Sequence, residues 1–377
     1  MEAAREPARP DGRKPNYWDY VRVEELLALQ SGLERDEQRI GNDEVMFITL
    51  HQVFELWFKL VLRELHSLRD LFKLERVDEQ ELASAVRSIR RVVTVLESAA
   101  KHFEVVETLT TREYLGFRNK LMPASGFQSA QLRQIEIVLG LSDGERIPLG
   151  PGGDYLEALR AHDGSESAAM RRVLAERRAG PSLLEAVENW LYRTPIDGVG
   201  PNGADSDATL DRFVEGYVAA CGREIDETLR FALARAHDPD ERGRLEGRYS
   251  EEKAAIRAFL TPSEAEGGAR RRRIRAATLL ILSYRELPLL AWPREVLDGL
   301  IELEQRMLVF RQRHARMVER VIGRRIGTGG SSGVDYLDST ALAYRVFKDL
   351  WAARTYQIRR VANPPLQNAR FYGFLNA

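Results

Sequence analysis

Cysteine is almost absent from this chain: Cys221 is the only one among 377 residues. An intramolecular disulfide and a zinc site built from cysteines are therefore excluded. A single thiol suits a reducing compartment, so we expect a cytoplasmic protein.

The sequence also lacks an excess of charge of either sign. Lys and Arg number 56 against 57 for Asp and Glu, which gives a net charge of -1. This balance argues against general attraction to nucleic acid or to a membrane surface. One basic cluster, Arg270 to Arg273 with Arg275, leads straight into an apolar stretch, and we interpret it as the solvated start of a helix.

Segments that would place the chain in or across a membrane are missing as well. The first residues, MEAAREPARPDGRKPNYW, contain no apolar core of the kind a secretory signal needs. The longest apolar run, residues 276–282, is far too short to span a bilayer. We therefore expect no membrane partner and no nucleic-acid partner.

Several catalytic templates are absent too. The sequence has no G-x-S-x-G elbow, no P-loop, no His-Glu-x-x-His and no Cys-x-x-Cys-His. It has six histidines, and no two of them stand at metal-chelating spacing. A mononuclear metal site with several histidine ligands is therefore not expected.

What the sequence does contain is helical periodicity, and no stretch alternates with the period of a strand. We predict an all-α fold, a helical bundle with a smaller helical insertion near 195–265. Residues 1–15 are expected to form a flexible arm, 16–362 the helical domain, and 363–377 a tail. The expected helical stretches include 42–72, 78–109, 155–191, 207–235, 239–260 and 344–358. Asn42 is a plausible N-cap of the first of these long helices.

Two histidines lie in apolar helical stripes. His314 is spaced by three or four residues from neighbours such as Phe310 and Met317, whereas Arg311, with Arg313, Arg316 and Arg320, marks the more polar side. His51 shares a helix face with Phe47, Phe54 and Phe58. From spacing alone, a core histidine with its hydrogen bonds satisfied is the commoner explanation for either residue.

A glycine-rich turn follows the His314 helix: residues 327–333 include four glycines and hydroxyl-bearing side chains. Glycine permits positive φ and lets backbone N–H groups approach a ligand. Elsewhere, Tyr114 and Arg118 are four residues apart and would lie one above the other on a helix. An arginine fork matches a carboxylate, although spacing alone favours a surface salt bridge for Arg118. A haem needs only one protein ligand and fits between the helices of a bundle, so His314 and His51 could form an axial and distal pair.

Three segments resemble signatures of the tryptophan 2,3-dioxygenase family of haem enzymes. They are FRQRHARMVERVIGRRIGTGGSSGVDYLDST, DEVMFITLHQVFELWFK and EYLGFRNKLMPASGFQSAQLRQIE. Weaker matches occur at 190–195 and 344–347, and the likeness extends in the family's order from about Tyr17 to Ile358. The resemblance implies a bundle enclosing non-covalent haem b, active as Fe(II), with O2 as co-substrate. It also implies oxidative cleavage of the indole C2–C3 bond of L-tryptophan to N-formylkynurenine.

The resemblance also implies roles for individual residues. His314 is similar in position to the axial ligand of the haem iron, and His51 to the distal catalytic histidine that faces the indole N–H. Other positions correspond to residues near the haem, namely Ser125 and Gly329, or to residues that bind the substrate, namely Phe47, Tyr114, Arg118, Thr328, Tyr17, Tyr20 and Val21. Arg118 corresponds to the partner of the substrate carboxylate. The family forms homotetramers in which the amino-terminal aromatics reach a neighbour's site, so a homotetramer is expected.

The chain departs from the family pattern near its amino terminus. Trp18 stands where a small residue is usual, and Val21 stands where leucine is usual. These differences leave an alternative open: one or two oxygen atoms are added to a substituted tryptophan in secondary metabolism. A catalytically inactive haem sensor or scaffold is a third hypothesis, which the joint presence of His51, Arg118, Thr328 and His314 disfavours.

Overall fold

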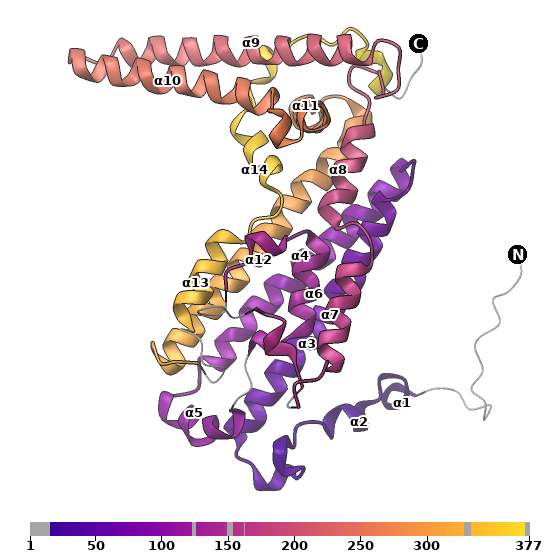
Figure 1. Cartoon of the computed structure of the whole chain (residues 1–377), viewed down its shortest axis with the longest axis vertical. Helices are drawn as coiled ribbons and strands as arrows, with labels where there is room; N and C mark the ends of the chain where they lie inside the picture. Colours follow the sequence, from indigo (N-terminus) through magenta and orange to yellow (C-terminus); the bar gives the residue numbers. More distant parts are fainter. Residues whose placement is uncertain (1–15, 123–125, 149–153, 162, 328–332, 374–377) are drawn as a thin grey trace, which may run out of the picture.

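The fold is all-α, as the periodicity predicts. The computed structural model describes residues 16–122, 126–148, 154–161, 163–327 and 333–373. Within these residues there is no strand, only the isolated bridges Arg160–Glu166 and Ile196–Val199. The α-helices, shown in Figure 1, are α1 (Tyr17–Val21), α2 (Val23–Leu27), α3 (Asn42–Phe72), α4 (Glu79–Val106), α5 (Thr111–Arg118), α6 (Ala130–Leu139), α7 (Ala168–Arg178), α8 (Leu183–Arg193), α9 (Ser206–Leu233), α10 (Pro239–Leu260), α11 (Gly268–Ser283), α12 (Ala291–Ile322), α13 (Val334–Ala343) and α14 (Lys348–Thr355).

Local sequence explains where the helices begin. Asp78, Thr110 and Ser182 each form a capping box with the glutamate three residues later, so the first backbone N–H groups of α4, α5 and α8 have partners. At the start of α3 the prediction was wrong by one residue. Gly41 is the N-cap in extended conformation, and Asn42 is already helical.

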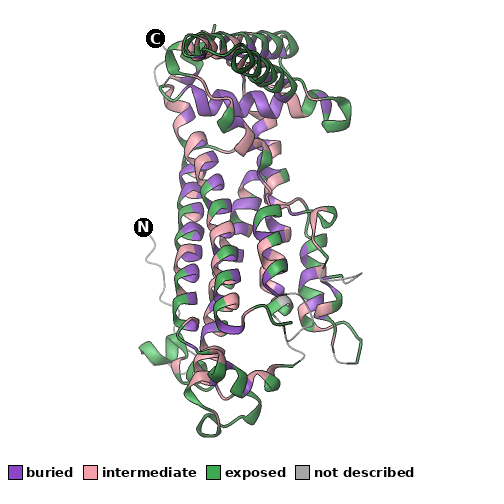
Figure 2. Ribbon diagram, turned by 90° about the vertical axis from the view of Figure 1, so that its left-hand side faces the viewer, coloured by how far each residue is buried: buried purple, intermediate pink, exposed green. Residues whose placement is uncertain are grey.

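The core of the molecule is a bundle of long helices in which α4 packs between α3 and α12. Leu65 of α3, Ala99 of α4 and Leu300 of α12 have no exposed surface. A Cβ atom added at Gly299 of α12 would stand 2.8 Å from Cγ2 of Ile89 on α4. Glycine at this position therefore permits the close approach of the two helices. Figure 2 shows that the buried residues follow the inward faces of the bundle.

The segment predicted as an insertion contains two antiparallel helices, α9 and α10. They form a hairpin that runs across the top of the bundle and projects to one side in Figure 1. The outer part of this hairpin is largely exposed in Figure 2. Its base is covered by α11, which is almost wholly buried after its first turn.

The basic run at the start of α11 corrects one sequence interpretation. We predicted a solvated helix start, but Arg273 and Arg275 are only 3% and 7% exposed. Arg273 donates to the carbonyls of Tyr192 and Val199 at 3.0 and 2.9 Å. Arg275 pairs with Asp349 at 3.1 Å. These guanidinium groups satisfy polar groups inside the protein, which a sequence pattern cannot distinguish from solvation.

The last described residues return to the upper end of the bundle. Tyr372 is 2% exposed and donates its hydroxyl hydrogen to the carbonyl of Pro195 at 2.9 Å. The carboxylate of Asp197 accepts hydrogen bonds from the backbone N–H groups of Gln367 and Asn368. The segment beyond 363 therefore packs on the body of the protein, at least as far as Tyr372.

By length and composition alone, α3 would be able to cross a membrane. It packs against α4, α6 and α8 in this fold, as a core helix does. Charged residues such as Glu55, Lys59 and Arg63 interrupt the sequence of α3, so it contains no long unbroken apolar run.

Candidate functional site

His51 lies on α3 in an aromatic surround. Its ring centroid is 4.0 Å from that of Phe47 and 6.3 Å from that of Phe54. Nδ1 lies 2.7 Å from the carbonyl oxygen of Phe47, and because a carbonyl only accepts, Nδ1 carries the hydrogen. Nε2 is then free to accept a hydrogen bond.

The protonation of His51 follows from its surroundings. Burial lowers the pKa of His51 below its usual value, although the bond to Phe47 and the nearby Glu55 carboxylate oppose this effect. The side chain nevertheless keeps solvent-accessible surface. The neutral imidazole of His51 is therefore open to solvent, and we use the word recess only as a label for the region between His51 on α3 and His314 on α12.

His314 lies on α12, on the other side of the recess. Its ring is parallel to that of Phe103, with centroids 5.3 Å apart, and 6.5 Å from that of Phe310. Burial is the main cause that lowers the pKa of His314 to about 4, with further contributions from His51 and Arg311. Among the described residues no side chain or carbonyl hydrogen-bonds to this imidazole. It is therefore a neutral ligand group whose orientation is set by ring packing.

Three phenylalanines connect the two histidines. Phe54 of α3, Phe103 of α4 and Phe310 of α12 touch one another, with ring centroids between 4.9 and 6.0 Å apart. They form an apolar wall between His51 and His314. The sequence analysis did not identify Phe103. The helical periodicity of residues 78–109 was the available signal, but it did not indicate which neighbour this helix would face.

Tyr114 and Arg118 extend the site from α5. The ring of Tyr114 is 6.0 Å from that of Phe47, which joins α5 to the His51 side of the recess. Burial raises the pKa of Tyr114, although its hydrogen bond with Arg118 opposes this effect. The surface salt bridge that spacing favoured for Arg118 is not found: within the described parts of the chain no carboxylate pairs with it. Its Nη2 donates to the carbonyl of Ile326 at 2.7 Å, and its buried Nε has no hydrogen-bond partner there.

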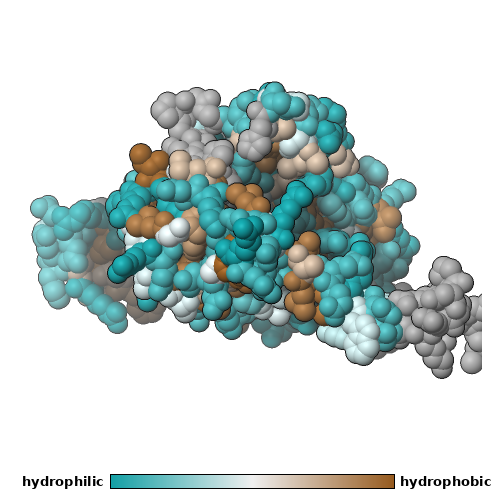
Figure 3. Space-filling model, turned by 90° about the horizontal axis from the view of Figure 1, so that it is seen from below, coloured by the Kyte–Doolittle hydropathy of each residue, from teal (hydrophilic) through white to brown (hydrophobic). Residues whose placement is uncertain are grey.

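The remaining predicted site residues are not brought to this recess in the single chain. Tyr17, Tyr20 and Val21 lie on α1, where they are 71%, 81% and 46% exposed. In Figure 1, α1 and α2 extend away from the lower end of the bundle. That end is largely hydrophilic, with separate apolar patches, in Figure 3. Three further predicted residues lie outside the described residues: Ser125, Thr328 and Gly329.

The donor set at the recess fits a haem. The described residues include no group of three or more His, Cys, Asp or Glu side chains able to hold a metal ion. A haem requires only one protein ligand, and a neutral imidazole with a free nitrogen is suited to that role. His314 meets this requirement, while the accessible His51 stands across the recess from it. The phenylalanine wall supplies the apolar contact that a porphyrin ring needs.

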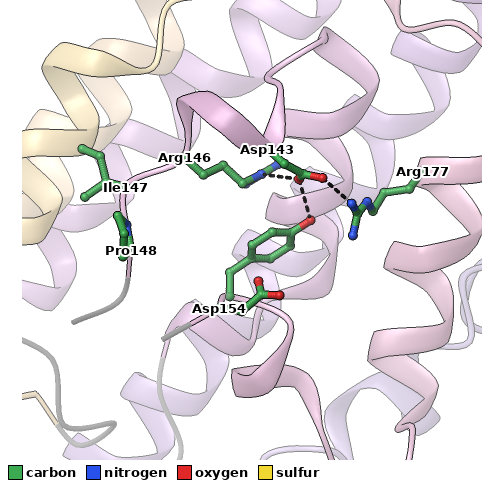
Figure 4. A pocket seen from close by; sticks show the side chains of 7 residues that line it. Asp143, Arg146, Ile147, Pro148, Asp154 and Arg177 are labelled. Carbon is green, nitrogen blue, oxygen red and sulfur yellow. Dashed lines mark hydrogen bonds and ion pairs between the residues drawn. The ribbon is translucent and has the colours of Figure 1, made fainter. Parts of the chain in front are cut away.

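A pocket lies beside the loop that follows α6. It has a volume of about 380 Å³ and is lined by Asp143, Arg146, Ile147, Pro148, Asp154, Tyr155 and Arg177 (Figure 4). Asp143 forms ion pairs with Arg146 and Arg177 there, and Arg146 also lies over the ring of Tyr155 at 4.3 Å. No predicted site residue lines this concavity.

Comparison with known proteins gives consistent matches along the chain. The model of the family described as tryptophan 2,3-dioxygenase matches residues 4–357. A protein named tryptophan 2,3-dioxygenase from Sorangium cellulosum is 56% identical over 365 residues, covering 95% of this chain and 87% of the relative. Tryptophan 2,3-dioxygenase 2 from Ralstonia nicotianae is 51% identical over 364 residues, covering 95% and 97%. A tryptophan 2,3-dioxygenase-like protein from Xanthomonas campestris is 49% identical over 276 residues, covering 71% and 98%.

Proposed function

The chain belongs to the tryptophan 2,3-dioxygenase family, and from this premise we propose that the recess between α3 and α12 is where it cleaves the indole ring of tryptophan. The chain is an oxidoreductase that uses haem and O2, as this family does. The observation that best supports the location is the pair of neutral imidazoles, His51 and His314, on opposite sides of one aromatic-lined recess.

We assign His314 as the protein ligand of a non-covalent haem b. Its imidazole is unprotonated at neutral pH and has no competing hydrogen-bond partner among the described residues. Phe103 and Phe310 fix the plane of its ring. When bound in the ferrous state, the haem supplies the centre at which O2 is activated for addition across indole C2 and C3.

His51, Phe47 and Arg118 are assigned to the substrate. With Nδ1 donating to the carbonyl of Phe47, the Nε2 of His51 can accept the indole N–H and so orient the ring. Phe47 offers an aromatic face for the flat indole. Arg118 has donors without a carboxylate partner, and it can pair with the substrate carboxylate through charge-assisted hydrogen bonds. Tyr114 holds Arg118 in place.

Three further assignments rest on family resemblance alone. Thr328 is proposed to contact the amino-acid end of the substrate, and Ser125 and Gly329 to lie near the haem. We further propose a homotetramer in which α1 carries Tyr17, Tyr20 and Val21 to a neighbouring subunit's site. The exposure of these residues in the single chain supports this arrangement. A cytoplasmic location is proposed from the single cysteine, which suits a reducing compartment.

The first experiment combines ferrous protein, O2 and L-tryptophan and follows the product by absorbance and mass spectrometry. A product heavier by two oxygen atoms, with the absorbance of N-formylkynurenine, is expected. A product heavier by one oxygen atom, or turnover confined to methylated or hydroxylated tryptophans, would instead support the substituted-tryptophan alternative.

A second experiment tests the haem ligand. His314→Ala should lose stoichiometric haem binding, measured by titration of the Soret band. His237→Ala, an exposed histidine between α9 and α10, is the matched control and should bind haem as the unmodified chain does. A five-coordinate, histidine-ligated haem retained by His314→Ala would contradict the assignment.

Removal of residues 1–27, which ends with α2 and leaves the contacts of Leu29 and Gln30 with α3 in place, tests the proposed role of the arm. The truncated chain should keep its helical content, because α1 and α2 contain no buried residue. Light scattering should show a smaller assembly, and the KM for tryptophan should rise. An unchanged tetramer with unchanged kinetics would exclude this role.

A further inference from the structure

A buried carboxylate lies among three guanidinium groups beside the His314 helix. Glu136 of α6 is 3% exposed. It accepts hydrogen bonds from Nη1 of Arg133 at 2.9 Å, Nη1 of Arg146 at 2.6 Å and Nη2 of Arg311 at 2.8 Å. Burial alone would raise the pKa of Glu136, but the three arginines, Arg133 foremost, hold it below its usual value. We call these four residues the Glu136 cluster.

The cluster contains more positive than negative charge. Three arginines and one glutamate give a net charge of two, and the side chains of all four residues are no more than 10% exposed. At the edge of the cluster, Asp143 lies 3.5 Å from Arg146 and also pairs with Arg177 (Figure 4). The charges of Asp143 and Arg177 cancel, so these two residues add no net charge to the cluster. Burial raises the pKa of Tyr336 beside the cluster, so its phenol adds no charge at neutral pH.

Stability alone does not account for this arrangement. A buried ion pair repays its desolvation only with excellent geometry, and surplus buried charges have no such compensation. Nε of Arg133 and Nη2 of Arg146 are buried without a hydrogen-bond partner among the described residues, whereas Nε of Arg146 has the carboxylate of Asp143 at 3.5 Å. One glutamate with one arginine would hold α6 against α12 at lower cost. The surplus positive charge therefore calls for another role.

The cluster acts close to the proposed iron ligand. Arg311 precedes His314 by three residues on α12, so the two side chains are neighbours on the helix surface. Its guanidinium lies 4.8 Å from the ring centroid of Tyr344, between α6 and the segment after α13. After burial and His51, Arg311 is the third group that lowers the pKa of His314, in keeping with this closeness.

We propose that the Glu136 cluster sets the electrostatic potential on the His314 side of the haem and so favours the ferrous over the ferric state. This inference rests on the proposed function, because it takes His314 as the iron ligand. Ferric haem gains one electron to become ferrous, so the site loses one unit of positive charge. A fixed positive potential nearby stabilises the form with the lower positive charge. Arg311 therefore acts through the electrostatic potential at the haem and does not touch the substrate.

The test is spectroelectrochemical titration of the haem-loaded protein, in which an electrode supplies the electron. At the midpoint potential of the unmodified protein, Arg311→Met should lower the ferrous-to-ferric ratio about tenfold, which corresponds to about 59 mV for a one-electron couple. Glu136→Gln removes the negative charge and should raise the ratio by a similar factor. Arg311→Lys retains the charge and should stay within about threefold of the unmodified protein.

The opposite signs separate an electrostatic effect from general disruption, because a loosened structure would shift both variants the same way. Arg273→Met is the matched control. This arginine is also buried, but its partners lie in α8, in α9 and in the turn between them. The ferrous-to-ferric ratio of this variant should therefore equal that of the unmodified protein. If Arg311→Met does not fold, Arg146→Met removes the same charge and should shift the ratio in the same direction. Shifts of equal sign for the arginine and glutamate variants, or shifts under threefold, would overturn the inference.

The outcome also separates this inference from the proposed function. Protein that binds haem and forms N-formylkynurenine, with Arg311→Met and Glu136→Gln at unchanged ratios, refutes the cluster's role alone. Protein that binds no haem refutes both.

Discussion

Among the described residues, the hydrogen-bond partners of Arg118 are neutral groups: the backbone carbonyl of Ile326 and the hydroxyl of Tyr114. The side chain is partly buried, and its buried Nε has no hydrogen-bond partner there. A carboxylate that reaches this guanidinium gains from pairing with it, because a polar group is costly to bury without a partner. We therefore expect Arg118 to hold the segment after α12 in the free protein and to pair with the substrate carboxylate once it binds.

We expect Arg118→Leu to raise the KM for tryptophan about 10- to 100-fold, since a hydrogen bond to a charged group contributes roughly 1.5–3 kcal/mol. The measurement is steady-state kinetics with L-tryptophan. Arg112→Leu changes an exposed arginine on the same short helix and should have little effect. Equal effects of the two substitutions would show that Arg118 does not bind the carboxylate.

At the level of single residues, the sequence was informative where a side chain follows a helical stripe. His51 and His314 were predicted beside Phe47 and Phe310, and the ring contacts confirm those neighbours. The prediction failed for Arg311, which was assigned to the polar side and is 9% exposed. Its partner Glu136 lies 175 residues earlier in the chain. No local pattern indicates which arginine will meet a distant carboxylate.

At the scale of helices, the contact between α4 and α12 depends on a glycine. Gly299→Ala would place a Cβ atom 2.8 Å from Cγ2 of Ile89, so either the Ile89 side chain or one of the two helices must shift. We expect a loss of about 1–3 kcal/mol in the free energy of unfolding, measured with urea, as for other overpacked cores.

The matched control is expected to change the free energy of unfolding in the opposite direction. Gly247 lies in α10 with nothing within 4 Å of an added Cβ atom. Gly247→Ala should therefore stabilise the protein by roughly 0.5–1 kcal/mol, because alanine restricts the unfolded chain and suits a helix interior. Destabilisation by both substitutions would mean that the loss at Gly299 cannot be attributed to its contact with Ile89.

Glu304 links α12 to the segment that leads into α14. Its carboxylate accepts hydrogen bonds from the backbone N–H groups of Val346 and Phe347 and from the indole of Trp351. Glu304→Ala leaves these donors without a partner, and we expect a loss on the order of 3 kcal/mol in urea unfolding. Glu302→Ala, an exposed residue on the same helix, should change the free energy by less than about 0.5 kcal/mol.

The helices themselves were largely predictable, because their starts carry capping residues and their faces carry apolar stripes. The expected helix over 78–109 is α4, with Asp78 as its N-cap. The block expected over 155–191 is instead divided into a short 3-10 turn, Glu157–Leu159, and the two helices α7 and α8. Each of these helices has its own serine N-cap. Both caps were visible in the sequence, but serine also occurs in loops, so its role depends on which backbone N–H groups it meets.

For the molecule as a whole, buried carboxylates determine the response to acid. Burial alone would raise the pKa values of Asp349 and Glu136, but the arginines around each carboxylate hold them below the usual value. A carboxyl group whose pKa is lower in the folded state adds stability above its unfolded pKa of about 4, and this stability is lost as the pH falls through the folded value.

We therefore expect the free energy of unfolding to fall steadily between about pH 5 and pH 3. Asp349→Asn removes one of the responsible carboxylates, so its free energy should depend less steeply on pH in this range. Parallel curves for the unmodified and substituted proteins, measured by urea unfolding at each pH, would show that Asp349 is not among the groups that cause acid loss.

The docking of Tyr372 has a consequence for biosynthesis. Its hydroxyl meets Pro195 and the backbone N–H of Gly198, in the turn between α8 and α9, more than 170 residues earlier. During translation the turn at 195–198 is made more than 170 residues before Tyr372, so it lacks these partners while α9 to α14 are synthesised. The bundle can assemble around α3, α4 and α12 as synthesis proceeds, but the turn receives the Tyr372 hydroxyl only once that residue has been added and has reached it. A ribosome stalled before Tyr372 would therefore hold a nearly complete bundle with this turn still lacking its partner.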